Sequence, residues 1–132
     1  MDHVDDELAI ALAPVLADLS SAPSISPEFP DDDWSGMQGV ATTMIFFGGA
    51  GTGISINLGT NRTQQMVSLA DQIQVAVVEA LWRAGRSPIW PECPEHLDTH
   101  PLRSVESNDT AVWVSPKSRI EVCLIGSLST VR

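Results

Sequence analysis

The chain has 132 residues, of which 43% are hydrophobic, and a formal net charge of -10. This length is enough for one domain, and the hydrophobic content excludes an intrinsically disordered chain. The charge argues against binding to DNA, RNA or an anionic membrane, because such binding depends on an excess of lysine and arginine. We therefore expect a single domain over residues 1–132 with no nucleic-acid and no membrane partner.

The acidic residues are concentrated in the first half of the chain. Residues 1–61 contain nine acids and no lysine or arginine, whereas residues 62–132 contain eight acids and seven bases. The nine acids are Asp2, Asp5, Asp6, Glu7, Asp18, Glu28, Asp31, Asp32 and Asp33. This asymmetry indicates an acidic face or tail, and it predicts a protein partner with a basic surface.

The start of the chain and its cysteines predict a cytoplasmic protein. The residues from Met1 to Glu7 are acidic where a presequence is positively charged, and no apolar run approaches the roughly 18 residues of a membrane span. Two cysteines, Cys93 and Cys123, are too few for a disulfide framework, so we expect reduced thiols.

Residues 1–38 predict an acidic helix followed by a loop. Apolar residues recur at helical spacing over residues 4–19, and the acids at positions 5–7 suit the positive end of a helix. Pro14 lies too deep for a first-turn position, so we expect the helix to kink or split near residue 13. Residues 20–38 are rich in proline, serine and aspartate and predict an extended loop.

Residues 39–58 predict a β-hairpin. A β-rich run from Gly39 to Phe47 is followed by a glycine-rich string at 48–53, and apolar and polar residues then alternate over residues 54–58. The glycines do not fit a phosphate-binding loop, because no helix follows them directly and no Gly-Lys-Ser/Thr sequence closes them. They predict positive-φ turn positions instead.

A long helix is predicted from Asn61 to Gly85. Asn61 and Gln64 fit a capping box, and Gly85 is placed to end the helix. The face predicted to be buried comprises Met66, Leu69, Ile73, Val77, Ala80 and Leu81. Val67, Val75, Val78 and Trp82 widen the apolar arc, which predicts burial on more than one side or docking against a partner. We favour burial.

Residues 86–132 predict a proline-rich crossover and a second hairpin. Strands are expected at Thr110–Val114 and Arg119–Ile125, joined by Pro116-Lys117-Ser118. The predicted fold class is therefore α+β, with two helices and two antiparallel β-hairpins, the C-terminal hairpin being ribbon-like. Its three parts are residues 1–38, 39–85 and 86–132.

Cys93-Pro94-Glu95-His96 has the form of half a zinc site. A zinc ribbon needs a second such turn about 15 to 20 residues further on, and there the chain reads Ser115-Pro116-Lys117-Ser118. Residues 90–125 therefore resemble a degenerate zinc ribbon in which serines stand at both ligand positions of the second turn. We predict no bound cofactor, with a small zinc-binding protein as the alternative.

The alternative zinc site would use Cys93, His96 and His100, with Cys123 as a further ligand. Asp98 is another candidate for that fourth position. Three ligands plus a water would also describe a catalytic zinc, but no general acid or base is evident beside them. The chain has no Gly-x-Ser-x-Gly sequence and no tyrosine, so we predict that it is not an enzyme and name no catalytic residue.

The segment Trp90-Pro91-Glu92-Cys93-Pro94-Glu95-His96 after a long helix resembles small bacterial proteins of unknown function, a resemblance that implies no activity.

Four of the seven aromatic residues are tryptophans, the residue type that contributes most to binding energy at protein interfaces. Trp82 and Trp113, on a predicted helix and strand, are expected in the core. Trp34 and Trp90, in predicted loops, are the candidate exposed anchors.

These patterns together predict a non-catalytic, acidic protein-interaction module. An immunity-type inhibitor, an antitoxin or an assembly adaptor would fit this description. Its partner-binding residues are predicted to be Asp31, Asp32, Asp33, Trp34 and Trp90, which would engage a basic partner surface. The sequence leaves the oligomeric state open.

Overall fold

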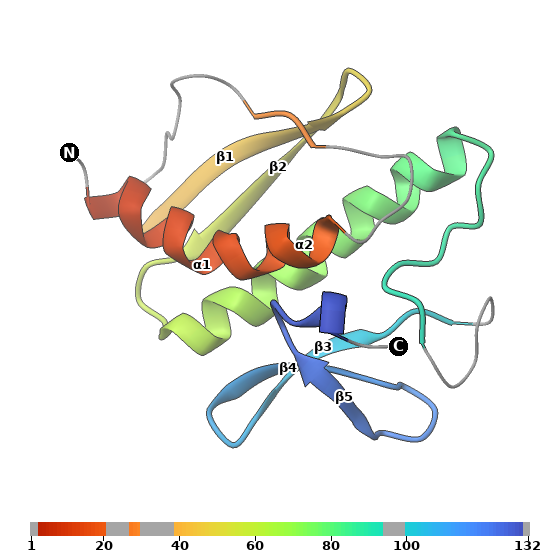
Figure 1. The fold of residues 1–132 in the computed structure, drawn as a ribbon. Coiled ribbons are helices and arrows are strands. Elements are labelled where there is room, and N and C mark those ends of the chain that lie inside the picture. The colour runs from red at the N-terminus through yellow and green to blue at the C-terminus, as the bar shows by residue number, and fades with distance from the viewer. Residues whose placement is uncertain (1–2, 21–26, 30–38, 94–99, 131–132) are drawn as a thin grey trace.

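The computed structural model describes residues 3–20, 27–29, 39–93 and 100–130. Within them the protein is α+β, with two α-helices, a two-stranded hairpin and a three-stranded antiparallel sheet. In chain order the elements are α1 (His3–Leu19), β1 (Val40–Phe47), β2 (Ala50–Asn57), α2 (Arg62–Arg83), β3 (Arg103–Ser107), β4 (Thr110–Val114), β5 (Glu121–Leu124) and the 3-10 helix η1 (Leu128–Thr130). Helix α2 lies between the two sheets, and α1 packs across it (Figure 1).

The predicted hairpin is confirmed, but its turn is shorter than the glycine string. Only Gly48 and Gly49 form the turn, with φ angles of 58° and 88°, as a two-residue hairpin turn requires. Gly51 and Gly53 belong to β2, where they oppose Phe46 and Met44 of β1.

The long helix is confirmed at both ends and on its buried face. The side chain of Asn61 accepts a hydrogen bond from the Gln64 backbone, and the Gln64 side chain reaches back to the Asn61 N–H. Gly85 has a φ of 72° just beyond the helix. Leu69 and Ile73 are fully buried, so they anchor α2 in the core.

A kink or a split was expected near residue 13, and the split is wrong because helix α1 is continuous from His3 to Leu19. Pro14 removes one amide donor, but the turns on both sides bury apolar side chains such as Ala11 and Val15. This packing keeps the turns of the helix together. Gly126 approaches Pro14 closely, since a Cβ atom on Gly126 would lie 3.0 Å from the Pro14 Cβ.

The C-terminal sheet has three strands in the order β3-β4-β5, so the predicted second hairpin is incomplete. Strand β3 was not expected because Val105 is its only large apolar residue. It is joined to β4 by Asn108 and Asp109, with φ angles of 49° and 63°. These residue types tolerate a positive φ, which makes them suited to a hairpin turn.

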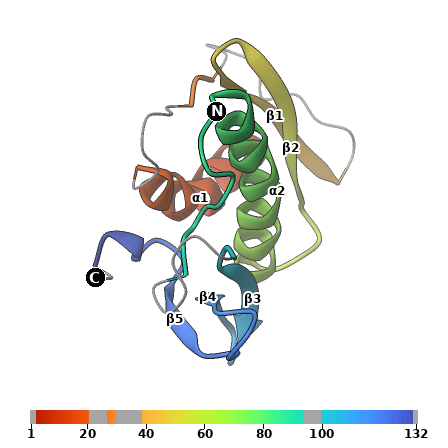
Figure 2. The same ribbon diagram turned by 90° about the vertical axis from the view of Figure 1, so that its right-hand side faces the viewer.

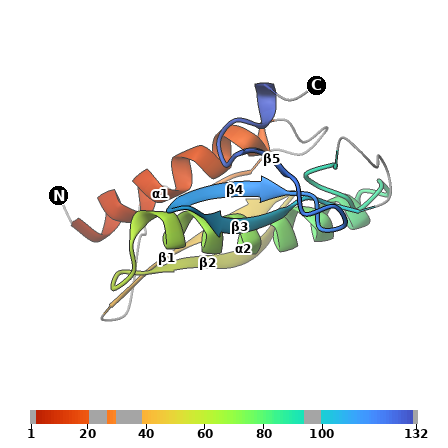
Figure 3. The ribbon, with the colours of Figure 1, turned by 90° about the horizontal axis from the view of Figure 1, so that it is seen from below.

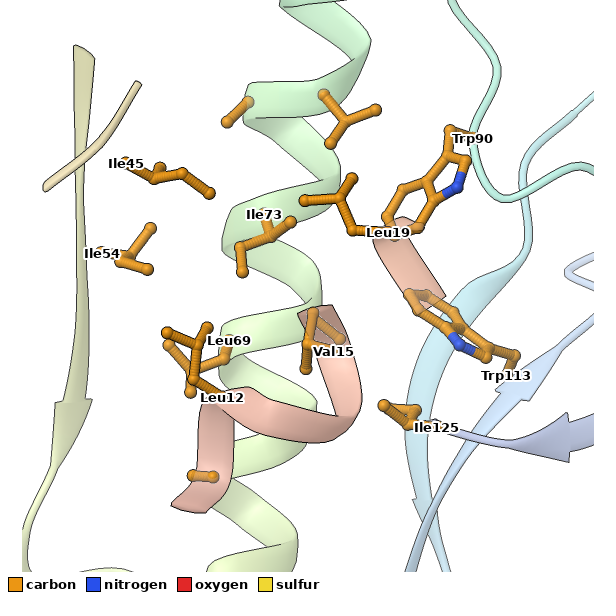
Figure 4. Close-up of a cluster of buried hydrophobic side chains, with 14 of the residues drawn as sticks. Leu12, Val15, Leu19, Ile45, Ile54, Leu69, Ile73, Trp90, Trp113 and Ile125 are labelled. Atoms are coloured by element: carbon orange, nitrogen blue, oxygen red, sulfur yellow. The ribbon is translucent and has the colours of Figure 1, made fainter. Parts of the chain in front are cut away.

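One hydrophobic core joins the two helices, the hairpin and the C-terminal part of the chain. Figure 4 shows α1 and α2 contributing Leu12, Val15, Leu19, Leu69 and Ile73, the hairpin contributing Ile45 and Ile54, and the C-terminal part contributing Trp90, Trp113 and Ile125. The hairpin and the C-terminal sheet pack against different parts of α2 (Figure 2). Among the described helices, none is long and apolar enough to cross a membrane.

Candidate protein-interaction surface

Trp90, a predicted exposed anchor, is buried. Its side chain is only 3% exposed, and its ring packs edge-to-face against Trp113 with 5.8 Å between ring centroids. Its carbonyl oxygen accepts a hydrogen bond of 3.0 Å from the Gln74 side chain. The expectation of an exposed Trp90 is therefore wrong. The other predicted partner-binding residues, Asp31, Asp32, Asp33 and Trp34, lie outside the described residues.

Among the three tryptophans that the structure describes, the exposed one is Trp82, which was expected in the core. Its side chain is 71% exposed near the C-terminal end of α2. Helix α2 is covered by α1, by β2 and by the strands β3 and β4, so one face remains open to solvent. Trp82 lies on that face.

Five exposed residues of α2 form a line that we call the outer stripe: Ser68, Asp71, Val75, Glu79 and Trp82. Their spacing of three or four residues places them on one helix face. Val75 is 59% exposed, and Val78 beside it is partly buried. A large aromatic and a branched apolar side chain are thus exposed on one face of the same helix, two turns apart.

Carboxylates border the apolar residues of the outer stripe. Asp71 lies one turn before Val75, and Glu79 lies between Val75 and Trp82. Along the chain, the bases that follow the stripe are Arg83 and Arg86, which lie at and beyond the C-terminal end of α2. The middle of the stripe is therefore negatively charged.

The wide apolar arc of this helix was the signal for the outer stripe. Val75 and Trp82 belong to that arc, for which docking against a partner was the alternative to burial. Helical periodicity shows that these two residues share a face, but it does not show whether another element covers that face. Whether that helix face is covered depends on where β2 and β3 pack, and the periodicity of the sequence gives no information about this.

The predicted zinc residues are only partly brought together. Cys93 is buried and His100 is half-buried, whereas His96 and Asp98 lie outside the described residues. An antiparallel bridge between Glu92 and Pro101 closes the segment that contains them. Among the described residues, no three His, Cys, Asp or Glu side chains gather where they could hold a metal ion.

The second turn of the resemblance, residues 115–118, lies at the end of the C-terminal sheet where the chain enters β3. Arg103, the first residue of β3, pairs with Val114, the last residue of β4, so the chain enters β3 and leaves β4 at one end (Figure 3). There the Ser118 N–H donates to the Ser115 hydroxyl at 3.4 Å, and the Arg119 N–H donates to the Ser115 carbonyl at 2.7 Å. Hydrogen bonds hold this turn together, and hydroxyl groups are poor substitutes for the thiolates that zinc prefers.

The environment of Cys123 also disfavours a thiolate. Burial and, to a lesser extent, the negative charge of Asp18 raise the pKa of the Cys123 thiol from 9.0 to about 11. The thiol is therefore protonated at neutral pH, and metal binding would have to displace that proton.

Comparison of the chain with protein-family models, curated proteins and solved structures found no match. A function has to be argued from the residues of the chain itself.

Proposed function

We propose that this protein is a non-catalytic interaction module that binds a basic surface of a partner protein through the outer stripe of α2. The observation that carries the proposal is the exposure of Trp82, whose side chain is 71% exposed on a regular helix, on the same face as the exposed Val75. Such a pair on the surface favours an interaction site over a purely structural role.

Tryptophan is the kind of residue from which a small interface gains most of its energy. Residues whose truncation costs 2 kcal/mol or more are enriched in tryptophan and lie at interface centres, surrounded by contacts that exclude water. Val75 and Val78 lie on the N-terminal side of Trp82 along the helix and would provide the surrounding apolar contacts of such an interface centre. The helix holds its position, so little backbone order has to be gained on binding.

Charge favours a basic partner. The chain carries a net charge of -10, and Asp71 and Glu79 flank the apolar residues of the stripe. Opposite charges at the rim speed association and exclude like-charged competitors. Asp31, Asp32, Asp33 and Trp34 remain predicted contributors to the same partner contact. An immunity-type inhibitor, an antitoxin or an assembly adaptor would use such a surface.

The test is affinity capture from the native lysate with three forms of the protein: wild type, Trp82→Ala and Ile120→Ala. Ile120 is 54% exposed after the β4 strand, so Ile120→Ala removes a similarly exposed apolar side chain away from α2. We expect wild type and Ile120→Ala to retain one partner with a basic contact surface and Trp82→Ala to lose it. A partner retained equally by all three forms would contradict the proposal.

Kinetics on that partner test the role of charge. The double variant Asp71→Asn/Glu79→Gln should bind more slowly, with a weaker dependence on salt, because long-range attraction is screened over about 10 Å at 0.1 M salt. Trp82→Ala should instead raise the dissociation rate. Unchanged association of the double variant at every salt concentration would rule out electrostatic recognition by the outer stripe.

The alternative function, small zinc protein, is tested separately by elemental analysis of protein purified without chelators. We expect less than half an equivalent of zinc, because serines occupy the second turn. A full equivalent that is lost in Cys93→Ser would favour the alternative over the interaction module.

A further inference from the structure

The direction of hydrogen bonding in the hairpin can be read from two of its residues. In an antiparallel pair, alternate residues direct their N–H and C=O groups toward the partner strand and away from it. Phe46 of β1 exchanges two hydrogen bonds of 2.8 Å with Glu28, on the side away from β2. Gly51 opposes Phe46, so Gly51 directs its backbone groups outward at the other edge of the sheet.

The same alternation applies along β2 to Gly53 and Ser55. The Ser55 N–H donates to the Gln72 side chain at 2.9 Å, and the Gln72 side chain donates to the Ser55 carbonyl at 2.8 Å. One glutamine of α2 therefore satisfies the edge at Ser55. Within the described residues, no group hydrogen-bonds to the outward N–H and C=O of Gly51 and Gly53.

This edge lacks the features that usually prevent strand pairing. Natural edge strands carry charges, prolines or bulges. Strand β2 has none of these, and the sequence between Asp33 and Arg62 contains no charged residue. The outer strands of the other sheet carry Arg103 and Glu106 on β3 and Glu121 on β5.

The open edge lies alongside the outer stripe. Gln72, which reaches Ser55, is a near neighbour of Val75 on α2, and the views in Figures 1 and 2 show β2 and α2 running side by side. The chain turns back after β2, so Gly53 and Gly51 follow Ser55 in the direction of the C-terminal end of α2. Two strand residues cover about 7 Å, or roughly four to five helix residues, which leads from Gln72 past Val75 toward Trp82.

We propose that an extended segment of the partner adds to β2 as a third strand, with its backbone hydrogen-bonded to Gly51 and Gly53. This inference rests on the proposed function and specifies how the partner binds. The added strand covers α2 where the two-stranded sheet ends, and its inward apolar side chains pack on Val75 and Trp82. The pairing of Ser55 with Gln72 ends the ladder and thereby sets the register.

Charge selects the occupant of the edge. Lysine or arginine side chains of the added strand point to the face of the sheet away from α2, and they are attracted over a longer range by the net charge of -10 and by the exposed Asp71 and Glu79. A second copy of this chain is a poor occupant, because each copy carries a net charge of -10 and β2 has no basic residue to offer. The segment that fits is extended, with alternating basic and apolar residues.

Two substitutions at Gly53 separate strand addition from other binding modes. A Cβ atom at Gly53 meets only the Met44 Sδ, at 3.8 Å, so Gly53→Ala fits the hairpin and keeps the outward N–H. Gly53→Pro removes that N–H, which faces away from β1, so the ladder between β1 and β2 keeps its hydrogen bonds. The proline variant therefore blocks the edge, and the alanine variant is its matched control.

The probe is a capped eight-residue peptide that alternates valine with lysine, and the control peptide alternates valine with glutamate. We expect the lysine peptide to slow amide hydrogen exchange at Gly51 and Gly53 at least tenfold, and the glutamate peptide to have no effect. Gly53→Pro and Trp82→Ala should each weaken binding at least tenfold, whereas Gly53→Ala should stay within twofold of wild type. Circular dichroism checks that each variant is folded.

The experiments distinguish a failure of strand addition at β2 from a failure of the proposed interaction surface. Binding that depends on Trp82 but leaves Gly51 and Gly53 exchange unchanged overturns strand addition and leaves the interaction surface standing. Loss of Trp82 dependence in both peptide binding and lysate capture overturns the proposed function as well. Slow exchange at Gly53 that appears on raising the protein concentration alone assigns the edge to a second copy and overturns the choice of a basic partner.

Discussion

The two sheets of this protein differ in how they are held to the rest of the chain and in how their edge strands are protected. The C-terminal sheet has three strands and is tied to α1 by Asp18, whose carboxylate accepts hydrogen bonds from Trp113 Nε1 at 2.7 Å, Gly126 N at 2.6 Å and Leu128 N at 2.9 Å. The hairpin has two strands, and along the outer edge of β2 Gln72 bonds to Ser55 and Gln65 bonds to the Asn57 carbonyl. The first sheet is held to α1 and carries charged residues on both outer strands, whereas the second leaves the outward backbone groups of Gly51 and Gly53 available to another chain.

The difference explains where the exposed apolar side chains lie. Helix α2 packs against both sheets, and its buried face includes Ile73 and Leu69. A third strand next to β2 would extend the hairpin sheet over Val75. Because the described residues contain no such strand, Val75 and Trp82 remain in solvent.

The largest effect is expected from Ile73→Asp compared with Val75→Asp, two residues apart on the same helix. Ile73 is fully buried, and an unpaired carboxylate there should cost on the order of 5 kcal/mol, enough to unfold a domain of ordinary stability. Val75→Asp should change the free energy of unfolding by about 0.5 kcal/mol or less. Urea unfolding followed by circular dichroism measures both, and equal losses would show that the outer stripe is part of the core.

Asp18→Ala tests how firmly the C-terminal sheet is attached. Removal of the carboxylate leaves the Trp113 indole N–H and two backbone N–H groups without their acceptor, and we expect a loss of about 3 to 5 kcal/mol. Asp71→Ala, at an exposed position on α2, should cost about 0.5 kcal/mol or less. A similar small loss for both variants would contradict the anchoring role of Asp18.

Cys123 reports on the same buried region through its reactivity. With a pKa of about 11 in place of 9.0, its thiolate fraction at pH 8 should be about 100-fold lower than in the urea-unfolded chain, and alkylation correspondingly slower. The raised pKa also predicts that the contribution of Cys123 to the free energy of unfolding is constant below pH 9 and falls as pH rises from 9 to 11, because the unfolded chain loses the proton first. Alkylation that levels off near pH 9 in the folded protein, or an unchanged pH dependence in Cys123→Ser, would refute the shift.

Smaller losses than for Ile73→Asp and Asp18→Ala are expected at two glutamines of α2 that bond to different parts of the chain. Gln74 donates to the carbonyl oxygens of Trp90 and Leu102 at 3.0 and 2.6 Å, and Gln74→Ala should cost about 2 kcal/mol. Gln72→Ala should cost about 1 kcal/mol, because water can replace the side chain at the open edge of Ser55. Thermal or urea unfolding of both variants measures the two losses of stability. A larger loss for Gln72→Ala than for Gln74→Ala would contradict the prediction.

The hairpin and α2 could be predicted because their signals are local. Gly48 and Gly49 supply the positive φ angles of the turn, and Asn61, Gln64 and Gly85 fix the ends of the helix. Each of these effects acts within a few residues of the chain, so spacing and residue type were enough.

Strand β3 and the exposure of the tryptophans could not be predicted in the same way. Val105 alone gives β3 little apolar alternation, so its pairing with β4 and packing on α2 determine the strand. Trp90 is buried by Trp113 from a distant part of the chain, and Trp82 is exposed because nothing in the described residues covers its side of α2. Both outcomes depend on tertiary neighbours that residue patterns do not specify.

The most direct test of the open edge is residue-resolved amide hydrogen exchange in the protein alone. The alternation along β2 directs the N–H of Thr52 toward β1 and the N–H groups of Gly51 and Gly53 toward solvent. We predict that Gly51 and Gly53 exchange at least tenfold faster than Thr52, and that Ser55, held by Gln72, exchanges slowly. Slow exchange at Gly51 and Gly53 in dilute protein would mean that the edge is already covered by the chain itself, which would contradict its availability to a partner.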